Sequence, residues 1–237
     1  PSEPLVIEAT ATLAPGEHGV LVADRVAFLA AYPGFDQGLI LGEFMGSLNN
    51  GGERIRMVDA DGVELFDFDY DDSDPWSIWA DNNGGSLVLR DPAMTPADEL
   101  GKHYYWRGST QPGGSPGAAD PTPLGVVVNE VLAHTDAPEV DTIELHNTTG
   151  EDIDIGGWYL SDDVDALLKF AIPGGTVIPA GVNLTFEESD FNPTPVTPGP
   201  NDFALSGSHG DSIWLVEANG AGDTVVALSD QVSFGAT

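Results

Sequence analysis

Short apolar runs, separated by Gly, Pro, Asn and Asp, recur along almost the whole chain. Apolar runs bounded by such turn-forming residues predict β-strands. One exception follows Asp24, where residues 25–32 have a helical pattern that stops at Pro33-Gly34. Because Asp is a preferred N-cap and proline ends a helix, we expect one or two helical turns there. The pattern therefore predicts an all-β protein with very little helix.

A β-hairpin is predicted at residues 54–70. Two strand-like runs flank Asp61-Gly62, a dipeptide that supplies the positive φ angles of a tight turn. In the second run aromatic residues alternate with carboxylates, so a period of two predicts buried rings and solvated acids. The rings are Phe66, Phe68 and Tyr70, and the acids are Asp67, Asp69 and Asp71. Another turn, Ala14-Pro15-Gly16, is predicted between short strands at residues 5–7 and 19–22.

Residues 111–123 are rich in Pro, Gly, Ser, Thr and Ala, which is typical of a linker. Beyond it, seven strand-like runs occupy about a hundred residues, which favours an Ig-like β-sandwich. The runs are residues 126–132, 142–147, 157–160, 169–172, 182–187, 212–217 and 224–228.

The part before this linker resembles the part after it. Residues 52–58 match residues 210–216, and Asp61-Gly62 matches Asn219-Gly220 at the same offset. Repeats at such spacing predict duplicated domains. We therefore expect two Ig-like β-sandwich modules in tandem: the later portion of a first module at residues 1–110, the linker at 111–123, and a second module at 124–237. Each module is incomplete as written, so a neighbouring copy or further sequence is expected to complete it.

An ordered set of motifs runs from residue 126 to residue 220. It comprises Asn129-Glu130, Ile143-Glu144-Leu145-His146-Asn147, Gly157-Trp158-Tyr159-Leu160-Ser161-Asp162, Pro179-Ala180-Gly181 and Gly210-Asp211. This set resembles the bacterial lamin tail domain, although the family prefers an aromatic residue where His146 stands. Shorter matches before the linker, such as Asn49-Asn50-Gly51-Gly52 and Tyr105-Trp106-Arg107, are similar to the later section of the same family.

The resemblance implies an Ig-like β-sandwich without catalytic residues, found in large secreted or surface proteins of bacteria beside enzymes or adhesion modules. The chain begins without Met, a basic segment or an apolar leader, so we expect a piece of a longer extracellular or cell-surface protein. No apolar run approaches the length of a membrane span.

Acidic residues outnumber basic ones by 39 to 7, which gives a formal net charge of −32. Such a field repels nucleic acid and anionic membranes, because both require a basic patch. The absence of cysteine excludes disulfide bonds. We therefore expect no nucleic-acid partner and no membrane insertion. The expected partners are other protein modules, copies of this chain, or an extracellular polysaccharide.

Carboxylates gather at two predicted turns, and oxygen-rich clusters suit Ca²⁺. The candidate ligands are Asp71, Asp72 and Asp74 in the first turn, and Asp162, Asp163 and Asp165 in the second. The alternative for either cluster is a solvated acidic surface. Ca²⁺ is thus the candidate cofactor.

Other polar and aromatic residues have structural interpretations. Asn129, Glu130 and Glu144 are expected to accept backbone N–H groups, with ligand binding as the alternative. Five aromatic residues are expected to plug sandwich ends, with sugar stacking as the alternative; they are Trp76, Trp79, Tyr104, Tyr105 and Trp106. The histidines lack zinc-site spacing, and Gly207-Ser208-His209-Gly210 precedes a strand, unlike a nucleophile elbow.

The sequence thus predicts a non-catalytic structural or interaction module of a larger secreted or cell-surface bacterial protein, in a repetitive or filamentous assembly. The alternative is a carbohydrate- or surface-binding accessory module of a secreted hydrolase, dependent on calcium.

Overall fold

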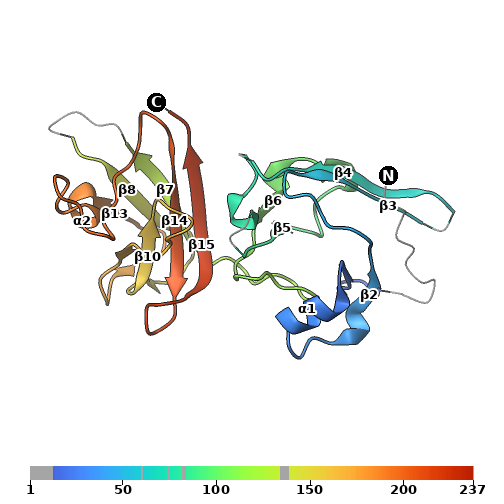
Figure 1. The fold of residues 1–237 in the computed structure, drawn as a ribbon. Helices are drawn as coiled ribbons and strands as arrows, with labels where there is room; N and C mark the ends of the chain where they lie inside the picture. Colours follow the sequence, from blue (N-terminus) through green and yellow to red (C-terminus); the bar gives the residue numbers. More distant parts are fainter. Residues whose placement is uncertain (1–12, 60, 74, 82–83, 134–138, 237) are drawn as a thin grey trace. The chain divides into compact units, whose positions relative to one another are not determined.

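The computed structural model describes residues 13–59, 61–73, 75–81, 84–133 and 139–236 (Figure 1). The fold is mostly β with a few short helices, as the sequence predicts. The strands are β1 (Val20–Val22), β2 (Ile40–Glu43), β3 (Glu53–Val58), β4 (Glu64–Tyr70), β5 (Leu87–Leu89), β6 (Trp106–Gly108), β7 (Val126–Leu132), β8 (Thr142–Asn147), β9 (Ile153–Asp154), β10 (Trp158–Ser161), β11 (Phe170–Ala171), β12 (Val177–Ile178), β13 (Asn183–Glu187), β14 (Asp211–Ala218) and β15 (Val225–Phe234). The helices are α1 (Arg25–Ala31), α2 (Glu188–Phe191) and the 3-10 turns η1 (Gln37–Leu39), η2 (Ile78–Ala80), η3 (Ala97–Glu99) and η4 (His103–Tyr105).

The chain forms two compact units, each assembled from several segments. Unit 1 consists of Pro1–Trp76, Leu89–Arg107 and Gly114–Asp120, and unit 2 of Ser77–Val88, Gly108–Gly113 and Pro121–Thr237. Residues 111–123 are therefore shared between the units. Two tandem sandwiches joined by a linker are not shown, and the boundaries predicted for them stay a prediction.

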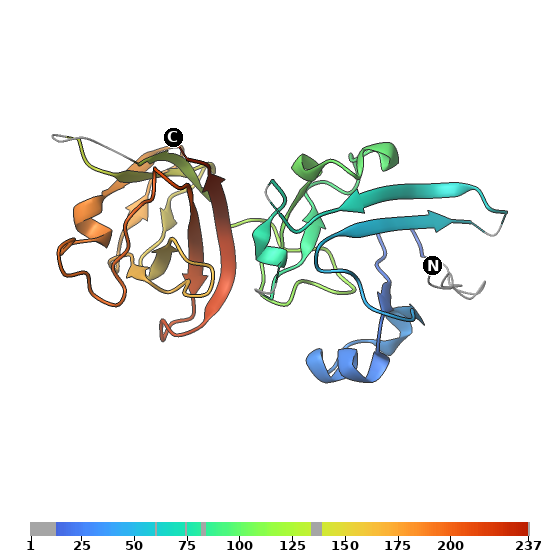
Figure 2. The same cartoon turned by 45° about the horizontal axis from the view of Figure 1, so that its top comes forward.

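Two sheets form the body of unit 2, with strand orders β13-β8-β7 and β11-β10-β14-β15 (Figure 2). All strand pairs in both sheets are antiparallel. Alternate residues of β8 and β14 point into the apolar core, including Ile143, Leu145, Ile213 and Leu215. Burying each such side chain stabilises the fold by about 1.5–3 kcal/mol.

The seven strands predicted after residue 124 are all present, and β7 and β8 cover the predicted residues without a shift. The strands β9 and β12, which pair through Ile153 and Ile178, were missed. Two residues are too few to display an alternating pattern, so no periodicity could have revealed them.

Side chains connect the two sheets where β7 lies beside β15. The register of β14 with β15 is irregular between Leu215 and Val216, which leaves Ser229 outside the ladder. Its hydroxyl donates to the carbonyl oxygen of Val126 at 2.6 Å. The next residue, Asp230, accepts the N–H of Val128 at 2.9 Å. These two bonds close one side of the sandwich without strand pairing.

The central strand β14 is buried on both faces. Trp214 and Val216 point away from the sandwich core and pack with Trp79 and Leu228. The rings of Trp79 and Trp214 lie 5.9 Å apart, and these two side chains are 1% and 0% exposed. The uninterrupted apolar run of residues 213–216 is the sequence mark of a strand that is covered on both sides.

Trp79 belongs to what we call the strap, the segments Ser77–Val88 and Gly108–Gly113 of unit 2. The strap is tied to β15 by a 2.7 Å hydrogen bond from the N–H of Leu228 to the carbonyl of Thr110. Two glycines leave the space that the ring of Trp79 occupies. A Cβ at Gly108 would lie 2.8 Å from the indole Cδ1, and a Cβ at Gly85 would overlap the ring. The strap can therefore close over Trp79 only because both positions lack a side chain.

Unit 1 contains the predicted hairpin and helix. In β3 and β4, Ile55 lies opposite Phe68 and Met57 opposite Phe66. Gly62 has a φ of 81° in the turn, as predicted. The helix α1 follows Asp24, whose carboxylate accepts the N–H groups of residues 26 and 27 at 2.8 and 2.9 Å. The hairpin and the helix are thus confirmed, whereas the strand predicted at residues 5–7 lies outside the described residues.

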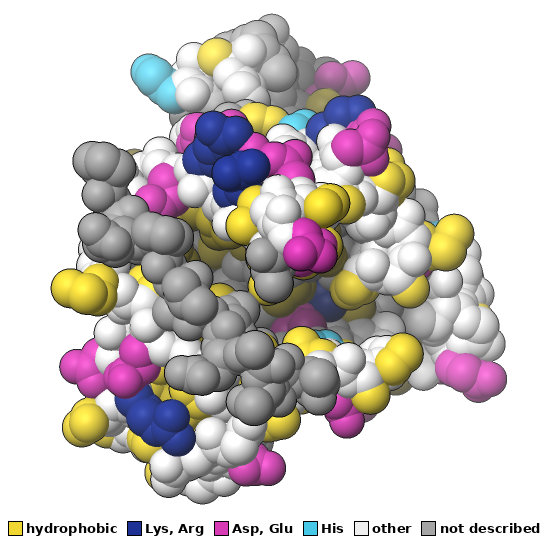
Figure 3. All heavy atoms as spheres, turned by 90° about the vertical axis from the view of Figure 1, so that its right-hand side faces the viewer, with side chains coloured by type: hydrophobic (Ala, Val, Ile, Leu, Met, Phe, Trp, Pro, Cys, Tyr) yellow, Lys and Arg dark blue, Asp and Glu magenta, His cyan; other side chains and the backbone are white. Residues whose placement is uncertain are grey.

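Apolar burial is sparse in the described part of unit 1, where Val22 and Ile40 are the buried apolar residues. Its sheets are two-stranded: β1 pairs with β2 in parallel, and β3 pairs with β4. Figure 3 shows one face of the molecule, on which apolar side chains are exposed and basic side chains lie beside acidic ones. Within the described residues, no helix is long and apolar enough to cross a membrane.

Candidate functional site

The motif residues Asn129, Glu144 and His146 meet Asn183 of β13 on the outer face of the β13-β8-β7 sheet. A register irregularity between Val128 and Glu130 lets the side chain of Asn129 reach β8. The carboxylate of Glu144 accepts the amide of Asn129 at 2.7 Å and that of Asn183 at 2.6 Å. Asn183 Oδ1 lies 2.5 Å from His146 Nδ1. The four side chains therefore form one continuous network across three strands.

This network corrects the role expected for Glu144. Its hydrogen bonds come from side-chain amides on neighbouring strands, not from backbone N–H groups. Glu130 lies directly opposite Glu144, and like charges in that position repel. The two amide donors offset this repulsion, so the network stabilises the sheet.

The first candidate Ca²⁺ turn is only partly described, because Asp74 lies outside the described residues. The carboxylate of Asp71 accepts hydrogen bonds from the backbone N–H of Ser73 at 2.9 Å and from the hydroxyl of Ser73 at 2.5 Å. These hydrogen bonds from Ser73 lower the pKa of Asp71 below its usual value. Asp71 therefore stabilises the turn after β4, and metal binding at Asp71, Asp72 and Asp74 stays a prediction.

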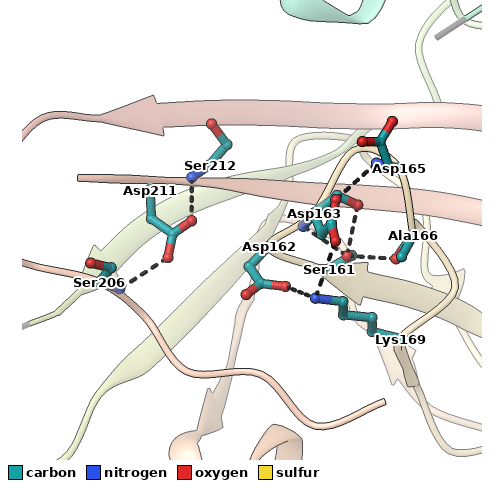
Figure 4. Close-up of polar contacts among 9 residues, drawn as sticks. All are labelled: Ser161, Asp162, Asp163, Asp165, Ala166, Lys169, Ser206, Asp211 and Ser212. Carbon is teal, nitrogen blue, oxygen red and sulfur yellow. Dashed lines mark hydrogen bonds and ion pairs between the residues drawn. The ribbon is translucent and has the colours of Figure 1, made fainter. Parts of the chain in front are cut away.

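The second candidate turn brings Asp162, Asp163 and Asp165 to one loop after β10 (Figure 4). Lys169 Nζ lies 2.6 Å from Asp162 Oδ1 and 3.7 Å from Asp163 Oδ2. The other carboxylate oxygen of Asp163 accepts the N–H of Asp165 at 2.9 Å. An ammonium group thus pairs with two of the three carboxylates of this turn that were expected to bind Ca²⁺.

Across the whole described part of the chain, no group of three or more His, Asp or Glu side chains is arranged to hold a metal ion. The pairing of Lys169 with Asp162 and Asp163 was not predicted from the sequence. A signal was present, since Lys169 is the only Lys or Arg from residue 108 to residue 237.

Two further motif residues maintain turns. Asp211 accepts the N–H groups of Ser206 and Ser212, each at 2.9 Å (Figure 4). The preceding Gly210 has a φ of 82°, and a Cβ there would lie 2.5 Å from the carbonyl oxygen of Phe234. The fully buried Ser161 donates to the carbonyls of Asp163 and Ala166. These contacts hold the backbone of both turns in place.

Ser208 and His209 lie 2.9 Å apart through Oγ and Nδ1. Both are exposed, and β14 follows them, as expected from the sequence. A nucleophile elbow is followed by a helix, so this pair has the wrong local structure.

The aromatic residues divide into buried and exposed groups. Trp79 is enclosed by the strap, and Trp106 stacks on Phe68 with ring centroids 5.5 Å apart. Both rings therefore pack against other apolar side chains, and their expected place at the ends of sandwiches stays a prediction. Tyr104 is 52% exposed, and its ring lies 4.8 Å from that of Tyr105.

Comparison with known families bears on unit 2. Residues 119–233 match the family model of the Lamin Tail Domain. The match covers just under half of the chain, over a stretch with an Ig-like β fold, and a second partial copy is not shown. No enzyme domain is detected. No curated protein matches the chain.

Proposed function

We propose that this chain, whose residues 119–233 match the family model of the Lamin Tail Domain, is a non-catalytic structural and interaction module of a larger secreted or cell-surface bacterial protein. One observation carries the proposal: Asn129, Glu144, Asn147, Ser161 and Asp211 of the family motifs bond to the backbone or to side chains of neighbouring strands. Asn147 is fully buried, donates to the carbonyls of Glu151 and Ile178 at 2.7 and 2.9 Å, and accepts the N–H of Thr149.

Buried polar groups that are fully bonded stabilise a fold, whereas reacting groups must reach a substrate. Asn147, Ser161 and Asp211 bond backbone groups, and Glu144 bonds the amides of two neighbouring strands. This use of the motifs supports a scaffold that presents surfaces to partners. The net charge of −32 favours a basic or neutral partner over nucleic acid.

The test is a pair of measurements on the purified chain. Light scattering across a range of concentrations and salt reports self-association, and a panel of ester, phosphate-ester and glycoside substrates reports turnover. We expect no turnover above buffer. Turnover that co-purifies with the folded chain and is lost in a point variant would contradict the proposal.

Light scattering also tests the filamentous assembly. We expect a monomer at low salt, because copies of so acidic a chain repel one another. Association that begins when salt screens this repulsion would indicate that copies of the chain are partners of one another.

The second candidate function is a carbohydrate-binding accessory module of a secreted hydrolase. The exposed ring of Tyr104, beside Tyr105 and 6.0 Å from Lys102 Nζ, favours it, because exposed aromatic rings stack on sugars. Pelleting with insoluble polysaccharides, with Ca²⁺ or a chelator, tests the idea. Retention that is lost in Tyr104→Ala would support this candidate, and no retention would exclude it for the polysaccharides used.

A further inference from the structure

An open cleft of about 540 Å³ lies in unit 2, away from the motif network. Three loops line it, at residues 164–169, 200–201 and 223–225. Val164, Leu167, Leu168 and Val225 provide apolar surface, and the same four side chains pack against the Trp79–Trp214 cluster. The floor of the cleft is therefore continuous with a buried core.

Residues 164–169 form the first wall of the cleft, and the contacts around Ser161 hold this loop in place. The hydroxyl of Ser161 bonds the carbonyls of Asp163 and Ala166 at 3.1 and 2.9 Å, and Lys169 pairs with the carboxylates of Asp162 and Asp163. The carboxylate of Asp165 accepts no hydrogen bond from the described residues, and Figure 4 shows it turned away from Lys169. This acid is therefore available to a partner.

Another wall of the cleft is the turn between β14 and β15. Asn219 Nδ2 and the hydroxyl of Thr224 donate to the carboxylate of Asp223 at 2.7 and 3.0 Å. Tyr159 donates its hydroxyl to the carbonyl of Gly222 at 3.1 Å. The carboxylate of Asp223 is thus fixed at the rim, while the residue itself is exposed.

Charge decides which chemistry fits this cleft. Unit 2 contains one Lys or Arg, Lys169, and its ammonium is already paired with two carboxylates. An anionic ligand would meet uncompensated repulsion from the remaining acids, whereas a cation would be attracted. The apolar floor additionally requires an apolar group beside that cation.

We propose that this cleft binds a segment of a partner protein in which apolar residues alternate with Lys or Arg. This proposal rests on the proposed interaction function. An aliphatic side chain occupies the floor formed by Leu167, Leu168 and Val225, and flanking Lys or Arg side chains pair with Asp165 and Asp223. Because exposed loops line the cleft, an extended segment can cross it without its ends being enclosed. A second copy of this chain is a poor occupant, because its net charge of −32 opposes the approach.

Calorimetric titration of the full chain tests the proposal with three synthetic probes. These are acetyl-Leu-Arg-Leu-Arg-Leu-amide, the same peptide with Glu in place of Arg, and the same peptide with Gly in place of Leu. We expect saturable binding of the first peptide that weakens with added salt, and much weaker binding of the other two. Equal binding of the Glu peptide would overturn the charge argument, and equal binding of the Gly peptide would overturn the role of the apolar floor.

Point variants locate the site. Asp165→Asn and Asp223→Asn should each weaken the first peptide about two- to fivefold, the range of one exposed charge pair. Glu130→Gln removes the same charge from β7, in the other sheet, and should change binding less. Similar losses in all three variants would mean a diffuse electrostatic attraction and would overturn the site. If no variant matters while the chain still lacks turnover, the cleft assignment fails and the proposed function stands.

Discussion

The contact of Trp79 with Trp214 predicts a large and specific effect of removing Trp79. The side chain is 1% exposed, so truncation to Ala removes about 200 Å² of apolar contact, or about 5 kcal/mol at about 25 cal/mol per Å². The indole N–H of Trp79 has no partner among the described residues, and such burial costs about 1–3 kcal/mol. The net loss in the free energy of unfolding of unit 2 should therefore be about 3 kcal/mol.

Denaturant unfolding of the full chain, followed by near-ultraviolet circular dichroism, measures this loss. Trp76→Ala is the matched control, because Trp76 is only half-buried and lies in unit 1, with its ring 6.2 Å from that of Trp106. We expect Trp79→Ala to lower the midpoint much more than Trp76→Ala.

Gly85→Ala provides an independent route to the same effect. The new Cβ would overlap the ring of Trp79, so this variant should destabilise unit 2 to a similar extent. Gly150→Ala is its control, since no atom lies within 4 Å of a Cβ placed there. If Trp79→Ala and Gly85→Ala both unfold like the wild-type chain, then Trp79 is not enclosed by the strap.

The charges and the core give four more predictions. Trp158→Ala should cost about 3–5 kcal/mol in denaturant unfolding, because Trp158 lies in the sandwich core, and an unchanged midpoint would place it at the surface. Added NaCl should raise the melting temperature by screening the repulsion among 39 acids, and Lys169→Ala should increase the additional effect of CaCl₂ at matched ionic strength, because Asp162 and Asp163 lose their cation. Hydrogen bonds from Asn219 and Thr224 lower the pKa of Asp223, so its stabilisation is complete above the unfolded pKa of about 3.9 and is lost as the pH falls through the lower folded pKa. Melting curves between pH 6 and pH 2 should therefore show a smaller acid-induced loss in Asp223→Asn than in the wild type.

The alternation of side chains carried enough information to predict seven strands of unit 2, but not the two-residue strands β9 and β12. In β8, Ile143 and Leu145 are buried while Glu144 and His146 face outward, and the pattern can be read directly from the sequence. The same applies to the hairpin of β3 and β4, where Gly62 supplies the positive φ. Local patterns were sufficient to predict these strands, because β3 and β4, and likewise β7 and β8, are consecutive in the chain and pair with each other.

Long-range packing could not be read in the same way. The seat of Trp79 depends on Gly85, Gly108 and Trp214, which lie far apart in the chain, and no periodicity connects them. The Ca²⁺ prediction at Asp162, Asp163 and Asp165 rested on carboxylates alone, and the pattern could not place Lys169 beside the first two. Likewise, a match between residues 52–58 and 210–216 indicated a repeat, but the described strands of unit 1 pair only two by two.

The most direct test of this account is a nuclear magnetic resonance titration of the isotopically labelled full chain with acetyl-Leu-Arg-Leu-Arg-Leu-amide. It distinguishes the motif network from the cleft. If the motif network serves the fold and the cleft serves binding, the amide shifts will concentrate at residues 164–169, Asn201 and residues 223–225. Shifts concentrated instead at Asn129, Glu144, His146 and Asn183 would show that the motif network is the binding site and would contradict the account.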